Sequence, residues 1–236
     1  MDIQDTFDQY ASDYDSWFIE NSGVLETEAN LVAYFLKNPG DTLSVGCGSG
    51  LFESVLRKKY DIDIRYGIEP AHGMAEIARK RGMTVEEVTA EEADYGENKY
   101  DTIMFNGTPC YIVDLQSVLK NVYKALKPGG KVVIIDIPKE SGYGTLYNLA
   151  KTLGSWDHPL LKDVHPQDPY PMEFVNVMHC RTTDEKVDML KNAGFQDFEY
   201  AQTLTRHPLY SNGDVEETIP GYDKGDYVAI KAIKKS

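Results

Sequence analysis

The sequence predicts an α/β protein built on a doubly wound, mostly parallel sheet, and three observations lead to this prediction. Apolar runs of strand length alternate with segments of helical periodicity between residues 42 and 137. A glycine-rich loop follows the first run, and the fifth run, residues 131–137 (KVVIIDI), is apolar at almost every position. Such a run is typical of a central parallel strand. Strict alternation of strand and helix indicates βαβ units with helices on both faces of the sheet.

The elements before residue 138 follow from this alternation. An amphipathic helix at residues 24–36 comes first and is expected to pack on the edge of the sheet. The last helix of this part has apolar residues at Leu115, Val118, Leu119, Val122 and Leu126, and the sequence KPGG stops it. The expected strands span residues 42–45, 62–68, 83–88, 100–105 and 131–137, and the expected helices between them span residues 51–60, 74–81 and 115–126.

The pattern breaks after Pro138 and returns near residue 182. Residues 139–176 are rich in Gly, Pro, Tyr, His and Asp and are expected to form an insertion or lid with one helix at 145–153. In the next helix, residues 182–192, Thr183 is the expected N-cap and Lys186 the N3 residue, so the capping box is incomplete. Strands at 196–203 and 227–233 complete a Rossmann-like, seven-stranded sheet in one domain over residues 1–236, with N-terminal lid helices at 1–37.

Composition favours a small-molecule substrate. The 236 residues carry a net charge of −14, and no block of Lys and Arg stands out beyond the tail at 231–235, so a nucleic-acid partner is not expected. No apolar run approaches the roughly 20 residues of a membrane span, and the acidic N-terminus lacks a signal-peptide core. We expect a cytoplasmic monomer or homodimer without a membrane partner.

A metal site is not expected either. The three cysteines, Cys47, Cys110 and Cys180, are odd in number and have no CxxC spacing, so they predict neither a disulfide framework nor a metal site. The histidines in and beyond the insertion lie among several aspartates, but at no compact metal-ligand spacing.

The glycine-rich loop, LSVGCGSG, ends the first strand and begins the first helix, where a doubly wound sheet has its ligand crevice. Glu69 follows the second strand, about 20 residues beyond the loop, where an acidic side chain accepts hydrogen bonds from both ribose hydroxyls. The loop lacks the third glycine of GxGxxG, and no Lys or Arg lies near it to meet a pyrophosphate. The ligand is therefore expected to be adenosine-like and not a dinucleotide.

Several ordered motifs resemble those of the class I S-adenosylmethionine-dependent methyltransferases. They are LSVGCGSG, GIEPAHGM, VTAEEADYGENKYDTIMFNG and LKPGGKVVIID, and the resemblance covers nearly the whole chain. The resemblance implies S-adenosylmethionine as the cofactor. The cofactor contacts that it implies are Val45, Gly46, Cys47, Gly48 and Gly50 in the loop, Glu69 on the ribose, Pro70, Met74, Ala90 and Glu91 around the adenine, and Asn106, Gly107 and Thr108 near the sulfonium.

One position departs from the family pattern. The family usually has an acidic residue at the start of the glycine motif, where this chain has Ser44. A hydroxyl can donate and accept a hydrogen bond but carries no charge to meet the cofactor's ammonium group. Either the cofactor affinity is lower or another carboxylate substitutes.

Three residues are candidates for catalysis. The segment FDQYASDYDSWF resembles the N-terminal YD segment of small-molecule methyltransferases similar to the quinone-biosynthesis C-methyltransferases, which implies that Tyr14 closes over the cofactor; an amphipathic helix packed on the core is the alternative. Tyr111 follows the fourth strand and is placed to meet the acceptor. His179 is a candidate base, with an ordinary surface or packing role as the alternative.

The leading hypothesis is therefore a methyltransferase that carries a methyl group from S-adenosylmethionine to a small molecule by in-line displacement. A nucleotide-binding oxidoreductase of the same sheet class is disfavoured by the missing third glycine. A non-catalytic S-adenosylmethionine-binding protein of the same fold is the alternative, and Ser44 is its positive hint.

Overall fold

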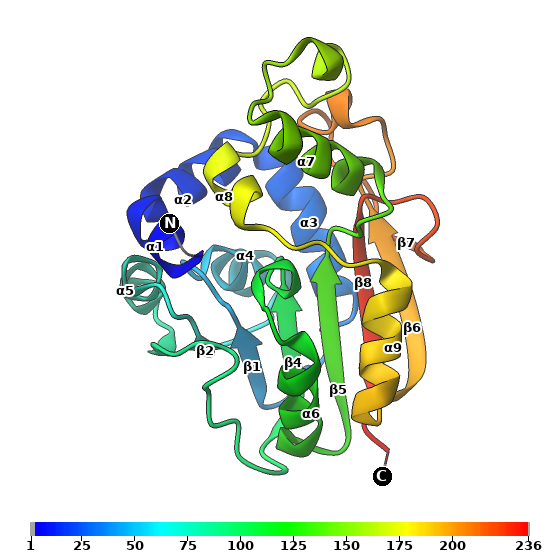
Figure 1. Cartoon of the computed structure of the whole chain (residues 1–236). Coiled ribbons are helices and arrows are strands. Elements are labelled where there is room, and N and C mark those ends of the chain that lie inside the picture. Colours follow the sequence, from blue (N-terminus) through cyan, green and yellow to red (C-terminus); the bar gives the residue numbers. More distant parts are fainter. Residues whose placement is uncertain (1–2, 236) are drawn as a thin grey trace.

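The strands form one sheet in the order β3-β2-β1-β4-β5-β8-β6-β7 (Figure 1). The structure is a computed structural model and describes residues 3–235. The predicted α/β fold class is confirmed, with eight strands in the described chain in place of seven. The extra strand, β7, has two residues, too few to leave a periodic signal. The strands are β1 (Thr42–Val45), β2 (Tyr66–Ile68), β3 (Thr84–Glu86), β4 (Tyr100–Asn106), β5 (Leu126–Asp136), β6 (Gln196–Thr203), β7 (Ile219–Pro220) and β8 (Tyr227–Ile233).

The parallel strands place their carboxyl ends at one edge of the sheet. β1 pairs in parallel with β2 on one side and with β4 on the other, so the chain order reverses between β1 and β4. β3 extends this parallel part beyond β2 and β5 extends it beyond β4, whereas β8 runs antiparallel to β5. A reversal of this kind opens the ligand crevice of a doubly wound sheet.

Helices cover both faces of the sheet, with α6 and α9 on one face and α3 and α4 on the other (Figure 1). Along β5, Val132 and Ile134 belong to the core that contains α6 and α9 residues, and Val133 and Ile135 to the opposite core; all four are fully buried. This confirms the interpretation of the apolar run as a central strand. The helices are α1 (Ile3–Gln9), α2 (Ala11–Glu20), α3 (Ser22–Tyr34), α4 (Leu51–Tyr60), α5 (His72–Lys80), α6 (Leu115–Ala125), α7 (Gly142–Leu153), α8 (Met172–Val177) and α9 (Thr183–Ala193).

Two local predictions were wrong in where an element begins. Thr182, not Thr183, is the N-cap of α9: its hydroxyl accepts a hydrogen bond from the Glu185 amide at 3.1 Å, and the Glu185 carboxylate accepts one from the Thr182 amide at 2.7 Å. The capping box is therefore complete. β2 starts at Tyr66 and not at residue 62, because its partner β1 begins only at Thr42; the alternating Ile62 and Ile64 are buried without entering the sheet.

The N-terminal helices and the insertion meet above the sheet. α1, α2, α7 and α8 lie over the carboxyl ends of the parallel strands (Figure 1). α8 contacts both α1 and α7, so the two segments that the sequence assigned to a lid are in contact. α8 lies at the end of the insertion, extends one residue beyond it, and was not predicted.

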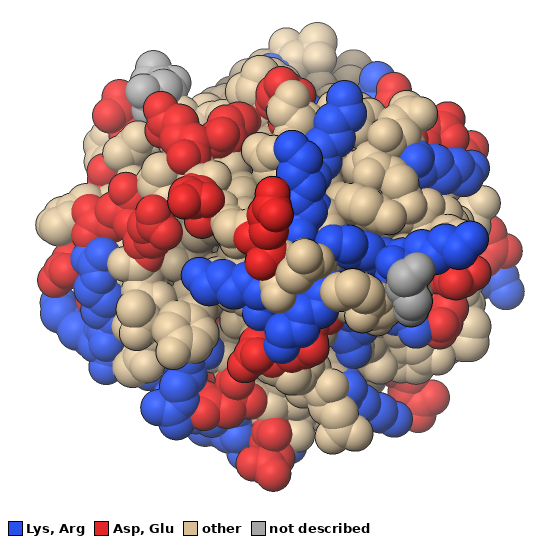
Figure 2. All heavy atoms as spheres, turned by 90° about the horizontal axis from the view of Figure 1, so that it is seen from below, with Lys and Arg blue, Asp and Glu red and all other residues tan. Residues whose placement is uncertain are grey.

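The opposite end of the molecule carries mixed charge. Seen from below, Lys and Arg side chains lie among Asp and Glu (Figure 2). At the amino ends of β1 and β4, for example, Lys127 Nζ lies 2.7 Å from Asp41 and 2.8 Å from Asp101. Mixed charge of this kind does not form the basic surface that nucleic acid requires.

Candidate active site

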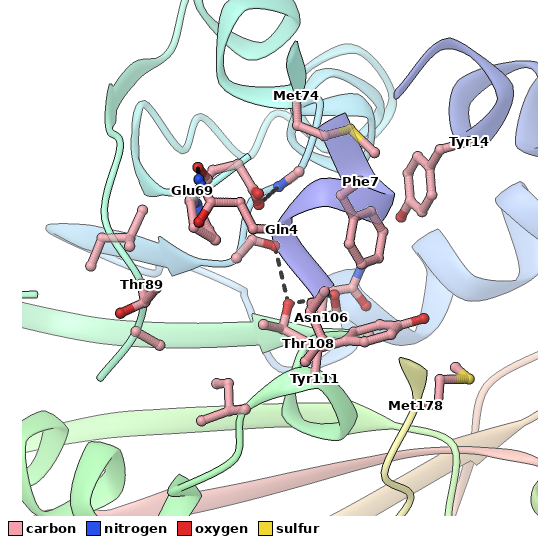
Figure 3. Close-up of a pocket in the computed structure, with 18 of the residues that line it drawn as sticks. Gln4, Phe7, Tyr14, Glu69, Met74, Thr89, Asn106, Thr108, Tyr111 and Met178 are labelled. Atoms are coloured by element: carbon pink, nitrogen blue, oxygen red, sulfur yellow. Dashed lines mark hydrogen bonds between the residues drawn. The ribbon is translucent and has the colours of Figure 1, made fainter. Parts of the chain in front are cut away.

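A cavity of about 420 Å³ lies at the carboxyl ends of the parallel strands. Its wall comes from the glycine loop, the segments after β2, β3 and β4, the N-terminal helices and the insertion. Glu69 and Thr89 lie toward one end and Tyr14 and Met178 toward the other, with Asn106 between them (Figure 3). The volume is within the range of small-molecule sites.

Two glycines of the loop have a left-handed backbone conformation and line the cavity. Gly46 has φ +65°, and a Cβ there would lie 2.2 Å from the Thr108 side chain, whose hydroxyl donates to the Gly46 carbonyl at 3.1 Å. Gly48 has φ +53°, and a Cβ there would meet no atom within 4 Å. Because Gly48 lines the cavity, its bare backbone leaves room for a ligand to approach the main chain.

Glu69 stands at the end of β2 and ties the glycine loop to the next segment. Its carboxylate accepts a hydrogen bond from the Gly48 amide and one from the Ala71 amide, both at 2.9 Å. Burial raises the pKa of Glu69 to about 7, and these two hydrogen bonds oppose the rise. A carboxylate has about four acceptor positions, so two remain for the hydroxyls of a ribose.

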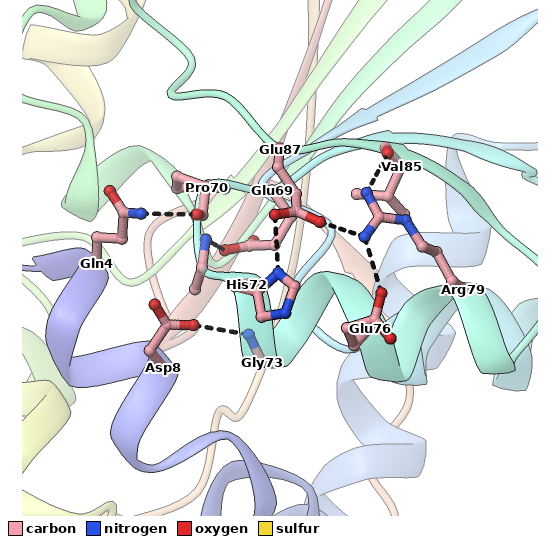
Figure 4. A network of polar contacts seen from close by, with 11 residues as sticks. Gln4, Asp8, Glu69, Pro70, His72, Gly73, Glu76, Arg79, Val85 and Glu87 are labelled. Atoms are coloured by element: carbon pink, nitrogen blue, oxygen red, sulfur yellow. Dashed lines mark hydrogen bonds and ion pairs between the residues drawn. The ribbon is translucent and has the colours of Figure 1, made fainter.

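Two hydrogen bonds join helix α1 to the segment that follows Glu69 (Figure 4). Gln4 Nε2 donates to the Pro70 carbonyl at 3.0 Å, and Asp8 accepts from the Gly73 amide at 2.7 Å near the start of α5. Since Gln4 and Pro70 also line the cavity, α1 forms part of the wall beside Glu69.

Ser44 has a carboxylate partner in the fold. Its hydroxyl donates to Glu53 Oε1 at 2.7 Å, and both side chains are buried. Burial raises the pKa of Glu53, and the hydrogen bond from Ser44 opposes the rise. α4 thus brings a carboxyl group beside the position where the family pattern has its acidic residue.

The structure gathers most of the predicted site residues around the cavity. Val45, Cys47 and Gly50 shape the loop without lining the cavity, and Gly50 packs against Met83 and Ala78. The predicted residues that do line it are Tyr14, Gly46, Gly48, Glu69, Pro70, Met74, Ala90, Glu91, Asn106, Gly107, Thr108 and Tyr111.

His179 lies outside this group. Its side chain is exposed and does not line the cavity, and its backbone amide donates to the Cys110 carbonyl at 2.8 Å.

An aromatic end of the cavity contains residues that sequence reasoning did not assign. We define it by Tyr14, Trp17, Phe18, Tyr147 and Tyr170, whose rings contact one another with centroids 5.0 to 6.5 Å apart. Helix α2 and the insertion supply these rings from distant parts of the sequence, so no local pattern joins them.

Glu28 is a further residue that the sequence reasoning missed. It lines the cavity from α3. Its signal was present in the sequence: a glutamate stands on the apolar face of the helix, four residues after Val24 and three before Leu31.

The described residues offer no candidate for a metal site and none for a membrane-spanning helix. Across residues 3–235, His, Cys, Asp and Glu form no group of three suited to a metal ion. No helix in that range combines the length and the apolarity needed to cross a bilayer.

A glycine loop after β1 and a carboxylate after β2, at the switch point of a doubly wound sheet, define a nucleoside-binding α/β protein. Comparison with known proteins makes the class specific. Residues 22–200 match the methyltransferase domain family, to which this chain therefore belongs. The predicted relationship to the class I S-adenosylmethionine-dependent methyltransferases is confirmed, and the cofactor is S-adenosylmethionine.

Three similar proteins illustrate the relationship. A structure from Thermotoga maritima, described as an S-adenosylmethionine-dependent methyltransferase and possible histamine N-methyltransferase, is 29% identical with a TM-score of 0.83, over 99% of this chain and 100% of that one. An uncharacterized protein of Methanocaldococcus jannaschii is 26% identical over 97% of this chain and 98% of its own length. Phosphoethanolamine N-methyltransferase 3 of Arabidopsis thaliana is 32% identical over 89% of this chain, which spans 41% of the plant protein.

Proposed function

We propose that this protein transfers a methyl group from S-adenosylmethionine to a small-molecule acceptor bound at the aromatic end of the cavity. The observation that carries the proposal is one cavity with two different ends: Glu69 and the glycine loop at one, and a cluster of aromatic rings at the other. Such a cavity has room for a nucleoside beside a second ligand.

The cofactor contacts proposed for this chain are the predicted residues that line the cavity. Glu69 accepts hydrogen bonds from the ribose, and Gly46 and Gly48 let the main chain approach the methionine part. Ala90 and Glu91 border the adenine, and the segment after β4 lies near the sulfonium. When bound, S-adenosylmethionine supplies an activated methyl group, so alignment of the acceptor with that group provides much of the rate.

Tyr14 and Tyr111 are proposed to act on the acceptor as neutral phenols. Burial raises the pKa of both hydroxyls well above the ordinary value for tyrosine, so neither is ionised near neutral pH. A neutral phenol can donate or accept a hydrogen bond, and the ring faces favour positive charge nearby. The proposal assigns no step to His179, because its side chain lies outside the cavity.

The names of two relatives bear on the acceptor. The plant proteins are named for phosphoethanolamine and the Thermotoga protein for histamine. A phosphate-bearing acceptor is not supported for this chain, because no Lys, Arg or His among the described residues lines the cavity. A cavity lining without basic side chains among the described residues favours an acceptor that carries no phosphate.

Calorimetric titration with S-adenosylmethionine, S-adenosylhomocysteine and NAD tests the cofactor part of the proposal. We expect the first two to bind and NAD to show no heat of binding. A screen of small molecules with labelled S-adenosylmethionine then tests transfer. Binding of the cofactor without transfer to any acceptor in the screen would favour the non-catalytic alternative, and absence of cofactor binding would overturn the proposal.

A further inference from the structure

Glu28 differs from every other buried carboxylate of residues 3–235. It is 9% exposed and lines the cavity, and its carboxylate has neither a hydrogen bond nor an ion pair to any described residue. Burying a charge without a partner is costly, so buried carboxylates are normally paired. The others each have a partner: Asp15, Glu53, Glu69, Asp136, Glu216 and Asp226.

The surroundings of Glu28 contain aromatic rings and no cation. After burial itself, the charge of Glu28 contributes to raising the pKa values of Tyr14, Tyr147, Tyr170 and Tyr227, so the carboxylate lies at the aromatic end of the cavity. No basic side chain of the described chain lines this wall. The missing partner must therefore come from a ligand or from water.

We propose that the methyl acceptor is a cationic amine whose ammonium group donates a hydrogen bond to Glu28 and packs against the aromatic end of the cavity. This inference rests on the proposed function and names the acceptor class for the same site. Carboxylates pair with ammonium groups when both are desolvated, and the faces of Trp and Tyr attract cations. Together these groups would select an amine over a neutral molecule of the same shape.

Glu28 also gives the reaction a place for the proton. An ammonium nitrogen has no free lone pair, so it first passes one proton to the Glu28 carboxylate. The nitrogen lone pair then forms the N–C bond while the C–S bond breaks and its electron pair stays on sulfur. The methylated product is again an ammonium ion, and Glu28 returns its proton to solvent when the product leaves. Burial raises the pKa of Glu28 to about 8 in the ligand-free protein, and a bound ammonium ion favours the ionised carboxylate that accepts the proton.

The test compares matched cationic and neutral ligands on three proteins. Ethylamine, cyclohexylmethylamine and phenethylamine are each paired with the corresponding alcohol and titrated in the presence of S-adenosylhomocysteine. The proteins are the wild type, Glu28→Gln, and Glu26→Gln, which removes the same charge from α3 where it faces Lys59 at 2.7 Å near solvent. Calorimetry measures binding, so the readout does not depend on turnover.

We expect at least one amine to bind the wild type about tenfold or more tightly than its alcohol. The preference should disappear in Glu28→Gln and persist in Glu26→Gln, while S-adenosylhomocysteine binds all three proteins alike. Equal affinity for amine and alcohol, no binding of any amine, or a preference that survives in Glu28→Gln would overturn the inference. If the wild type does not bind S-adenosylhomocysteine, that result would instead count against the proposed function.

Discussion

The hydroxyl of Ser49 in the glycine loop donates to Asp15 Oδ1 of helix α2 at 2.5 Å. Arg81 completes the arrangement: it lies 2.6 Å from Asp15 Oδ2 and donates to the Ser49 carbonyl at 2.8 Å. Asp15 follows Tyr14, which lines the cavity. The position of Tyr14 is therefore coupled to the loop that is proposed to hold the cofactor.

Replacing Asp15 should loosen helix α2. Asp15→Asn removes the ion pair with Arg81, and we expect the free energy of local opening of residues 11–20 to fall by about 1.5 to 3 kcal/mol. Hydrogen exchange of the α2 amides measures this change. Asp13→Asn, an exposed position on the same helix, is the control. Equal exchange in the two variants would show that Asp15 does not hold the helix.

Glu69→Ala should weaken binding of S-adenosylmethionine by about 1.5 to 3 kcal/mol, the scale of hydrogen bonds to a charged group. The substitution also removes the acceptors of the Gly48 and Ala71 amides, so a melting curve must accompany the calorimetric titration. Unchanged affinity in a folded variant would remove Glu69 from the ribose site.

Affinity for S-adenosylmethionine should fall as the pH drops below about 7. The pKa of Glu69 is raised to about 7, so the ionised form that accepts from ribose hydroxyls predominates only above that pH. Calorimetry between pH 5.5 and 8.5 measures the slope. In Glu69→Gln this contribution to the slope should vanish; a slope identical to that of the wild type would assign the dependence to another group.

Glu28→Gln should stabilise the ligand-free protein at alkaline pH. The folded-state pKa of about 8 exceeds the ordinary 4.5, so the folded state holds its proton more tightly and stability declines as pH rises between these values. At pH 8.5 we expect the free energy of unfolding of the variant to exceed that of the wild type by about 1 to 3 kcal/mol, less than the full pKa shift implies because Glu28 borders a cavity and not a packed core. Denaturant unfolding at pH 5 and pH 8.5 measures the difference, which should be smaller at pH 5. A variant no more stable than wild type at pH 8.5 would contradict the expectation.

Ser44→Glu should not tighten binding of the cofactor. Although it restores the residue type of the family pattern, it sets a second carboxyl group against the buried Glu53. We expect a lower melting temperature and no gain in affinity. Ser44→Ala, which loses only the hydrogen bond to Glu53, should lower the free energy of unfolding by about 1 kcal/mol. Tighter binding by Ser44→Glu would mean that Glu53 does not substitute for the missing acid.

The sequence by itself determined the sheet class, the glycine loop and the position of Glu69. These features depend on local periodicity and short spacing, which a chain displays before it folds. The apolar pattern of β5 predicted that both of its faces are buried, and the glycine loop predicted the position of the ligand crevice.

Only the tertiary structure decided which side chains share the cavity. Glu28 lies on α3, far in sequence from Tyr147 and Tyr170, which both lie in the insertion. Ser44 contacts Glu53 because α4 packs beside β1. The capping box at Thr182 was missed for a different, local reason, because placing the N-cap one residue too late replaces Glu185 with Lys186 at N3. Long-range packing decides which of these segments meet, although a single sequence can mark one of the residues involved, as the glutamate on the apolar face of α3 does.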